Sequence, residues 1–354
     1  MPEESITEQR KAEHVDIILN EKVSAEYNYW NDVHLIHKSL PEVNYDDIDI
    51  STKLFGRKLN APLIISAMTG GFPAAKEINK NLAFAAAEVG VGMGVGSQRA
   101  ALESPELEET YAVVKDHDVP LRFANIGAPQ LIEQSGKTPY SFEEAQRAMK
   151  MIDAHVLMVH MNFLQEVVQP EGDKKAKGCL YAIQSLAARL PVVAKETGAG
   201  ISREVAIELK KMGVRGLDVG GLGGTSFSAV EYYRARKEAQ TLKERLGATF
   251  WNWGIPTPAS VVLARVGIPI IATGGVRSGL DIARAICLGA SAAGMARPLL
   301  EAAKKSADEA VKELRMIIEE MKAAMFLTGS ANLDDLAGAQ CIVSRPTSDW
   351  MEVG

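Results

Sequence analysis

Eight short apolar segments recur along this chain, and each is followed by a segment with the hydrophobic pattern of a helix. Consecutive parallel strands need a crossover of this kind, so the repeat predicts parallel β-strands. Eight strand–helix units are typical of a barrel, whereas a doubly wound sheet would need far fewer. We therefore predict an α/β fold, a (β/α)8 TIM barrel with an N-terminal extension. The predicted strands span residues 62–68, 91–95, 121–124, 155–160, 191–194, 216–219, 269–272 and 292–295.

The 354 residues exceed what this repeat needs, and the surplus lies mainly at the two ends. We predict an N-terminal extension and connecting segment over 1–60, the barrel over 61–330 and a C-terminal tail over 331–354. Short strands are expected near Ile48 and Leu54. Helical patterns lie near 74–89, 104–117, 175–189 and 203–212, and two more lie within 226–268.

Composition narrows the class of protein. Apolar residues make up 47% of the chain and charged residues 24%, as in ordinary globular proteins. The net charge of −6 gives no reason to expect nucleic acid as a partner. No apolar run reaches the ~18 residues of a membrane helix, and the polar first residues do not form a signal peptide. The three cysteines are too far apart for a zinc site. We expect a cytoplasmic protein with no membrane partner.

A glycine pair follows the seventh predicted strand. Gly274 and Gly275 precede Arg277, and Arg297 follows the eighth strand. Glycines allow backbone N–H groups to approach an oxyanion, and a helix N-terminus adds positive potential. The loops after strands seven and eight of a barrel commonly hold phosphate. A tight turn that only packs a helix on the sheet is the alternative, but the two arginines favour a phosphate site.

Polar side chains gather directly after the predicted strands, which places them together at the C-terminal mouth of a barrel. Cations outnumber carboxylates there, which suits an anionic ligand. Glu166 is the carboxylate best placed for a divalent metal, or it pairs with a cation; His160 is an acid/base group or a hydrogen-bonded core histidine. A nucleophile beside a histidine is not recognisable. The mouth residues are Thr69, Ser97, Gln98, Arg99, Asn125, His160, Asn162, Gln165, Glu166, Lys195, Glu196, Thr225, Arg277 and Arg297.

Several of these residues belong to short fragments that stand in a fixed order. They are Arg10-Lys11-x-x-His14, Ser66-Ala67-Met68-Thr69-Gly70-Gly71, Gly96-Ser97-Gln98-Arg99, Asn125-Ile126-Gly127-Ala128, His160-x-Asn162-x-x-Gln165-Glu166-x-x-Gln169-Pro170-Glu171-Gly172-Asp173, Lys195-Glu196, Gly223-Gly224-Thr225 and Gly274-Gly275-Val276-Arg277. The ordered set resembles the type 2 isopentenyl diphosphate isomerases, which use FMN on a TIM barrel. Phe163 departs from that pattern, because a proline is common there, and it puts only the local loop shape in doubt.

The resemblance implies roles for individual residues. His160 and Gln165 would be catalytic, and Glu166 would bind Mg²⁺. The flavin would contact Ala67, Met68, Thr69, Ser97, Asn125, Lys195 and Thr225, and its phosphate would contact Gly275, Val276, Arg277, Ala296 and Arg297. The substrate would contact Arg10, Lys11, His14, Ser97, Gln98, Arg99, Asn162 and Gln165.

The implied reaction interconverts isopentenyl and dimethylallyl diphosphate with reduced FMN, Mg²⁺ and NADPH as the reductant. An FMN oxidoreductase on the same barrel is one alternative, but those enzymes usually need a histidine near the late strands or a cysteine at the mouth. All six histidines here lie at or before His160. A non-catalytic flavin-binding barrel is the other alternative. We also expect a homo-oligomer, a tetramer or octamer, whose N-terminal segment covers its own or a neighbouring mouth.

Overall fold

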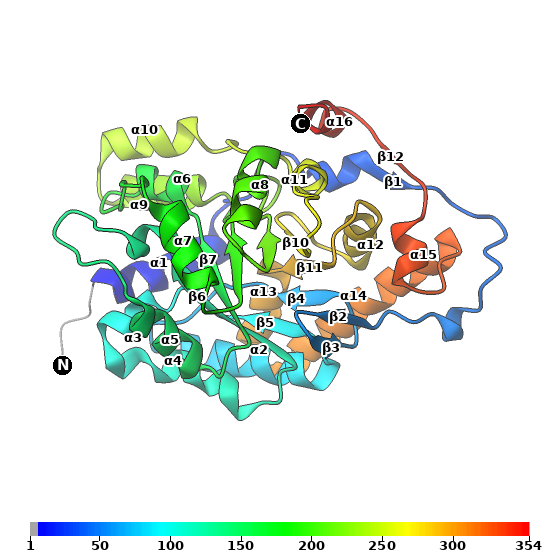
Figure 1. The fold of residues 1–354 in the computed structure, drawn as a ribbon, viewed down its shortest axis with the longest axis horizontal. Coiled ribbons are helices and arrows are strands. Elements are labelled where there is room, and N and C mark those ends of the chain that lie inside the picture. The colour runs from blue at the N-terminus through cyan, green and yellow to red at the C-terminus, as the bar shows by residue number, and fades with distance from the viewer. Residues whose placement is uncertain (1–5, 354) are drawn as a thin grey trace.

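The computed structural model describes residues 6–353, and within them eight parallel strands close into a barrel surrounded by helices (Figure 1). This confirms the fold predicted from the repeat. Each strand pairs with its neighbours in the order β10-β11-β4-β5-β6-β7-β8-β9. The strands are β4 (Leu63–Ile65), β5 (Gly92–Gly94), β6 (Leu121–Gly127), β7 (Val156–His160), β8 (Val192–Lys195), β9 (Gly216–Asp218), β10 (Ile270–Thr273) and β11 (Ala292–Met295).

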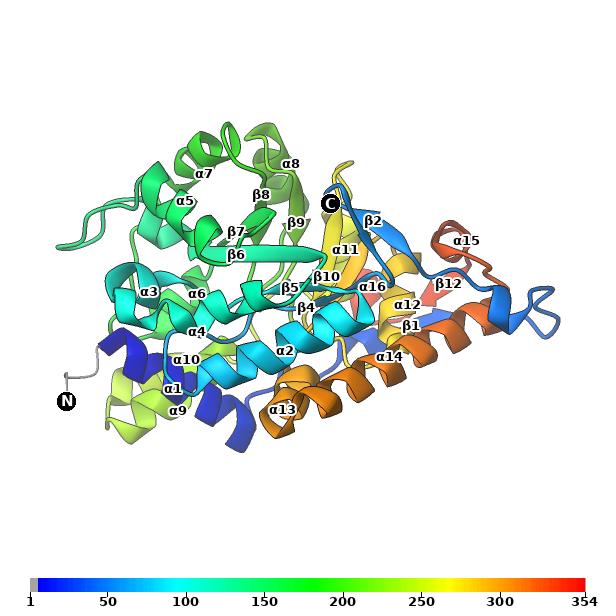
Figure 2. The ribbon, with the colours of Figure 1, turned by 90° about the horizontal axis from the view of Figure 1, so that it is seen from below.

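Helices with one apolar face cover the outside of the barrel (Figure 2). The predicted helix over 104–117 is wrong as a single element, because the chain there forms a 3₁₀ turn (Pro105–Leu107), α4 (Glu109–Ala112) and a second 3₁₀ turn (Val113–Asp116). The extended Ser104 before Pro105 separates them from the preceding α3 (Arg99–Glu103). The other covering helices are α2 (Ala75–Val89), α5 (Phe142–Met151), α7 (Cys179–Ala187), α8 (Arg203–Lys211), α12 (Gly279–Cys287), α13 (Arg297–Lys305) and α14 (Ala307–Thr328).

A hairpin closes the N-terminal end of the barrel. It consists of β2 (Thr52–Leu54) and β3 (Arg57–Leu59), so the strand expected near Leu54 is confirmed. Leu54 and Leu59 are buried in one cluster with Phe123 and other residues that fill the barrel interior. Since apolar side chains fill this end, a ligand can enter only from the C-terminal mouth.

The two terminal segments lie against each other. In contrast to the expected strand near Ile48, that residue follows a 3₁₀ turn (Tyr45–Asp47) and lies in irregular chain. Strand β1 (Val33–Leu35) follows another 3₁₀ turn (Tyr29–Asp32) and pairs antiparallel with β12 (Cys341–Val343), which joins residues far apart in sequence. The short helices α15 (Leu333–Ala337) and α16 (Thr347–Met351) flank β12. The domain limits at 60 and 330 stay predictions.

The N-terminal helix α1 (Ile6–Asn20) lies over the mouth and packs on an insertion after β9. That fully described stretch holds three helices rather than the two expected, namely α9 (Phe227–Lys237), α10 (Thr241–Thr249) and α11 (Thr257–Leu263). Ile17 and Val23 are buried against Ala229 and Val230 of α9. The insertion therefore forms the surface on which α1 rests. Between residues 6 and 353, no helix is long and apolar enough to cross a membrane.

Candidate active site

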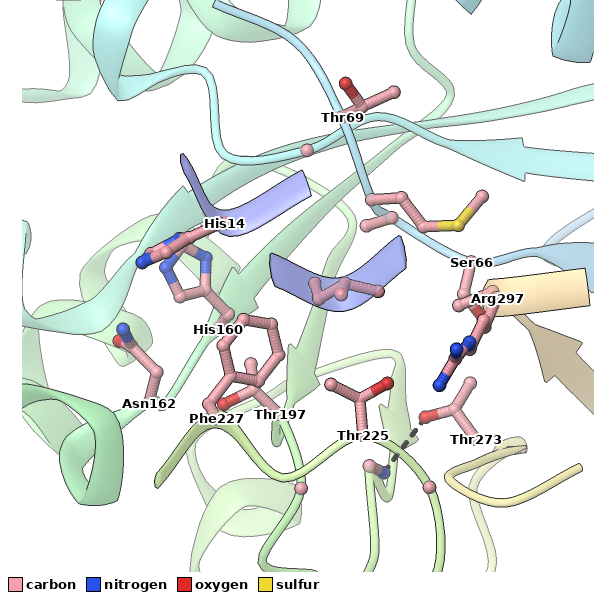
Figure 3. Close-up of a pocket in the computed structure, with 18 of the residues that line it drawn as sticks. His14, Ser66, Thr69, His160, Asn162, Thr197, Thr225, Phe227, Thr273 and Arg297 are labelled. Atoms are coloured by element: carbon pink, nitrogen blue, oxygen red, sulfur yellow. Dashed lines mark hydrogen bonds between the residues drawn. The ribbon is translucent and has the colours of Figure 1, made fainter. Parts of the chain in front are cut away.

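A cavity of about 740 Å³ opens at the C-terminal mouth and is partly covered by α1 (Figure 3). Residues at or after the ends of all the barrel strands contribute to its wall, as does the short helix α6 (Phe163–Val168). In the view of Figure 3, His14 and His160 lie at one side and Arg297 and Thr273 at the other. The predicted site residues in its wall are Arg10, Lys11, His14, Ala67, Met68, Thr69, Ser97, Arg99, Asn125, His160, Asn162, Gln165, Glu166, Lys195, Thr225, Gly275, Val276, Arg277, Ala296 and Arg297.

Among the residues expected at the mouth, Gln98 and Glu196 are absent from the cavity wall as far as residues 6–353 describe it. The Glu196 carboxylate instead accepts from the N–H groups of Thr197, Gly198 and Ala199. Gln98 is 0% exposed. Its Nε2 donates to the Ala148 carbonyl at 2.8 Å, and its Oε1 accepts from the Asn125 N–H at 2.8 Å. Gln98 therefore holds Asn125 in place from behind, and its position argues against the expected contact with substrate.

The loops after β9 and β10 meet through their backbones. Gly275 has φ 74°, and a Cβ on it would lie 2.7 Å from the Gly223 carbonyl oxygen. A Cβ on Gly224 would lie 2.6 Å from the Gly275 nitrogen. Such approach requires glycine, and Gly224, Gly274 and Gly275 line the cavity together with Arg277 and Arg297.

Two helices begin beside the paired loops of Gly223–Gly224 and Gly274–Gly275, which we call the glycine cradle. At α12, the Gly279 N–H donates to the Glu320 carboxylate at 2.7 Å, and Ser278 caps the helix through the Asp281 N–H. At α13, Ala296 has no polar side chain to act as a cap, Pro298 has no N–H, and the Leu299 N–H donates to the Ala296 carbonyl at 3.1 Å. Ala296 and Arg297 line the cavity, so an anion at this end of α13 would meet the Arg297 side chain rather than a row of open N–H groups.

Four residues of the wall each carry a buried polar atom that lacks a hydrogen-bond partner within the described part of the chain. These atoms are Ser66 Oγ, Thr69 Oγ1, Asn162 Oδ1 and Gln169 Nε2. An unpaired buried polar atom costs about 1–3 kcal/mol, so such atoms call for an explanation. Their position in one wall indicates a polar ligand as the missing partner.

A glutamate that the sequence analysis missed organises one side of the cavity. Glu231 of α9 is 0% exposed, and its Oε1 lies 2.9 Å from both His14 Nε2 and Gln165 Nε2. Its Oε2 accepts from Arg234 at 2.8 Å. Burial opposes ionisation, but these neighbours outweigh it and lower the pKa of Glu231 to about 2. Glu231 therefore remains ionised and joins α1 to Gln165.

His160 and Gln165 are both held in fixed orientations. His160 Nδ1 lies 2.8 Å from Asn125 Oδ1. Burial, followed by the charges of Lys195 and Lys11, lowers the pKa of His160 to about 3, so the ring is neutral at pH 7. Gln165 donates to Glu231 and accepts from Asn162 at 3.3 Å.

The cations at the α1 side of the mouth occupy defined positions. Lys11 donates to the carbonyls of Gly70 and Ser97 and to the Tyr111 hydroxyl at 3.1, 2.5 and 2.7 Å. Burial, with Arg10 and Arg99 nearby, lowers the pKa of Lys11 to about 7.

The two arginines are paired with carboxylates of the loop after α6. Arg10 lies 3.6 Å from Glu171, and Arg99 lies 3.0 Å from Asp173. Three positive groups from α1 and the loop after β5 thus gather at one end of the cavity.

Glu166 is the wall carboxylate expected to bind a metal. Its Oε1 accepts from Asn162 at 3.0 Å and its Oε2 from the Asp173 N–H at 2.7 Å. Burial raises its pKa despite these bonds. Within residues 6–353, no group of three or more acidic, histidine or cysteine side chains is arranged to hold a metal ion. A metal at Glu166 would need ligand oxygens and water for most of its coordination.

Some wall residues that the sequence analysis missed do carry a sequence signal. Thr273 directly follows the predicted strand 269–272, and Ser66 lies near the end of the predicted strand 62–68. Both therefore belong with the polar residues expected at the mouth of the barrel. Asp218 lies behind the wall and is buried. An acidic residue within the apolar run 216–219 is unusual, and this could have indicated a functional role from the sequence. Glu231 has no such signal, because only the packing of α9 brings it to Gln165.

The comparisons place this barrel in a class of FMN-dependent enzymes. The family model described as FMN-dependent dehydrogenase matches residues 11–111 and 255–343. A mandelate oxidase variant solved with an FMN adduct is similar in fold, with a TM-score of 0.61 and 20% identity over 94% of this chain and 92% of that one. A lactate oxidase of Pediococcus acidilactici gives a TM-score of 0.65 at 15% identity, over 96% and 88%.

Sequence relatives place the chain more narrowly within that class. The isopentenyl-diphosphate delta-isomerase of Picrophilus torridus is 47% identical over 98% of this chain and 99% of the relative. The enzyme of the same name from Thermoplasma volcanium is 49% identical over 98% and 99%. The chain belongs to the isopentenyl-diphosphate delta-isomerase family, in its FMN-dependent type 2 form.

Proposed function

We propose that this protein interconverts isopentenyl and dimethylallyl diphosphate with reduced FMN and Mg²⁺. The observation that carries the proposal is one cavity with two separate groups of anion-binding residues. The glycine cradle with Arg277 and Arg297 forms the first, and Arg10 and Arg99 form the second, next to Lys11, whose three donors already bond to the protein. A flavin phosphate and a substrate diphosphate would fill them, which a barrel with one phosphorylated ligand does not require.

The residues present fit FMN. The glycine cradle suits its phosphate, and Arg277 and Arg297 beside it supply the countercharge. The unpaired Thr69 Oγ1 and Ser66 Oγ suit a ring system rich in hydrogen-bonding groups. Asn125 and Lys195 from β6 and β8 would complete the contacts. When bound in its reduced form, FMN supplies an electron-rich face and a proton on N5.

The second group of cations would hold the diphosphate. Arg10 and Arg99 now face Glu171 and Asp173, so a diphosphate would compete with these carboxylates for the guanidinium groups. Glu166 would bind Mg²⁺, with diphosphate oxygens and water as the remaining ligands. Mg²⁺ would then offset the negative charge that Glu166 and the diphosphate bring to the same place.

His160 and Glu231 do not supply the proton for the alkene. His160 is neutral and Glu231 is ionised at pH 7, so neither offers an acidic proton. Glu231 fixes one N–H of Gln165, and Asn162 occupies the Gln165 carbonyl, so this amide can orient a substrate without reacting. An alkene is a weak base, and its protonation leaves a cation that water would capture.

Helix α1 would exclude that water. Its Val15 and Ile18 line the cavity beside Phe227 of α9. The polar pairs that hold α1 in place include His14 with Glu231, Glu13 with Arg234 and Arg10 with Glu171. A helix held in this way acts as a lid that keeps the reacting carbons dry. In this structure the lid covers the mouth of its own chain.

An assay with isopentenyl diphosphate, FMN, Mg²⁺ and a reductant tests the proposal. After one reduction of the flavin by NADPH or dithionite without oxygen, many turnovers should follow with no further reductant consumed. Stoichiometric NADPH loss for each product would identify an oxidoreductase instead. We further propose NADPH as the usual reductant, a cytoplasmic location and a homo-oligomer of four or eight chains, which sedimentation would test.

A further inference from the structure

Lys195 is the last residue of β8, and its side chain has a buried acidic neighbour that the family roles leave out. The strand register sets His160, Lys195 and Asp218 in one row across β7, β8 and β9. Lys195 Nζ lies 3.4 Å from Asp218 Oδ2 and donates to the Glu196 carbonyl at 2.9 Å. Lys195 lines the cavity, whereas Asp218 lies behind it and is 1% exposed.

The other oxygen of Asp218 is also occupied. Asp218 Oδ1 accepts a short hydrogen bond from the Thr273 hydroxyl at the end of β10. The Thr273 oxygen in turn accepts from the Gly220 N–H at 3.1 Å. The carboxylate therefore has Lys195 on one side and Thr273 on the other, and it cannot rotate without breaking one of these contacts.

These contacts fix the direction of the N–H donors of the Lys195 ammonium group. An ammonium group has three N–H donors. The Glu196 carbonyl takes one and Asp218 faces a second, which leaves the third for the cavity.

We propose that Asp218 and Thr273 are positioning residues that orient the Lys195 ammonium toward the flavin and set the positive charge that the flavin ring meets. This inference rests on the proposed FMN site. Charge beside the ring tunes the reduction potential of a flavin, because reduction adds negative charge to the ring. The pair thus acts on the cofactor through Lys195 and needs no contact with the substrate.

Removal of the Asp218 charge has a definite consequence. In Asp218→Asn, a protonated Lys195 would stand uncompensated beside the ring and stabilise reduced FMN. One charge at an effective dielectric of about 20 is worth about a decade in affinity across about 12 Å. We expect reduced FMN to bind about tenfold tighter relative to oxidised FMN, which raises a two-electron potential by about 30 mV.

The test is the midpoint potential of bound FMN, measured by dye equilibration without oxygen across the neutral pH range. Thr273→Val keeps the shape of Thr273 but removes its hydroxyl, and we expect it to shift the potential less than Asp218→Asn and in the same direction. Thr273→Ser keeps the hydroxyl, so its midpoint potentials should equal those of the wild type. Far-ultraviolet circular dichroism and the flavin spectrum verify that each variant is folded and loaded.

Wild-type potentials at every pH in Asp218→Asn would overturn the inference. If that variant fails to fold, Thr273→Val decides alone, and wild-type potentials there would overturn it equally. A wild-type chain that binds no FMN would instead refute the proposed function. The two failures are therefore distinguishable.

Discussion

Alanine at Gly275 perturbs the phosphate cradle directly. Gly275 has φ 74°, and its Cβ would lie 2.7 Å from the Gly223 carbonyl oxygen and 3.1 Å from Asn28 Oδ1. A side chain at this φ costs about 1–2 kcal/mol. Moving the backbone of Gly223 to relieve the clash costs about 1–3 kcal/mol more. We expect Gly275→Ala to lower the free energy of unfolding by about 2–5 kcal/mol.

Gly136 offers a matched control. It has φ 72°, but nothing lies within 4 Å of the Cβ that alanine would add there. Gly136→Ala should therefore show only the conformational cost of about 1–2 kcal/mol. The difference between the two variants isolates the contact between Gly275 and Gly223, which holds the cradle together.

Urea unfolding and FMN titration by flavin fluorescence measure both effects. Displacement of the cradle should weaken FMN binding in Gly275→Ala by at least about tenfold, or 1.4 kcal/mol, and leave Gly136→Ala like the wild type. Equal FMN dissociation constants in both variants would show that the cradle does not hold the phosphate. An equal loss of stability in both would refute the clash.

Three further predictions concern the substrate side. Glu166→Gln should bind FMN normally but lose Mg²⁺-dependent turnover, and a normal rate with the same Mg²⁺ dependence would remove Glu166 from the metal site. A chain that starts after His14 should stay folded and yellow but show a Michaelis constant raised at least about tenfold, because charge-assisted hydrogen bonds are worth about 1.5–3 kcal/mol; a wild-type value would refute the lid. Burial lowers the pKa of His160 from 6.5 to about 3, so the unfolded chain binds the extra proton and stability falls as the pH drops through that range. His160→Gln should flatten this slope in urea unfolding by up to about 1.4 kcal/mol for each pH unit, and parallel slopes would contradict the burial of a neutral ring.

Two neighbouring residues show the limit of predicting mouth residues from their position after a strand. Gln98 and Arg99 both follow β5, yet Arg99 lines the cavity and Gln98 points behind it to Asn125 and Ala148. Helix α3 begins at Arg99, so the side chains of these two residues leave the backbone in different directions. The sequence predicts which loop reaches the mouth, but it does not predict which side chain of that loop enters it.

The sequence by itself determined the barrel and the composition of its mouth. Alternation of apolar runs and amphipathic helices is local, and strand ends converge wherever such a barrel closes. Only the tertiary structure decided what surrounds those residues. Glu231 reaches His14 across 217 positions, and Thr273 reaches Asp218 across 55. Such contacts depend on how whole helices and strands pack. Burial and charge pairing act between residues that are distant in sequence, so they produce no recognisable sequence pattern.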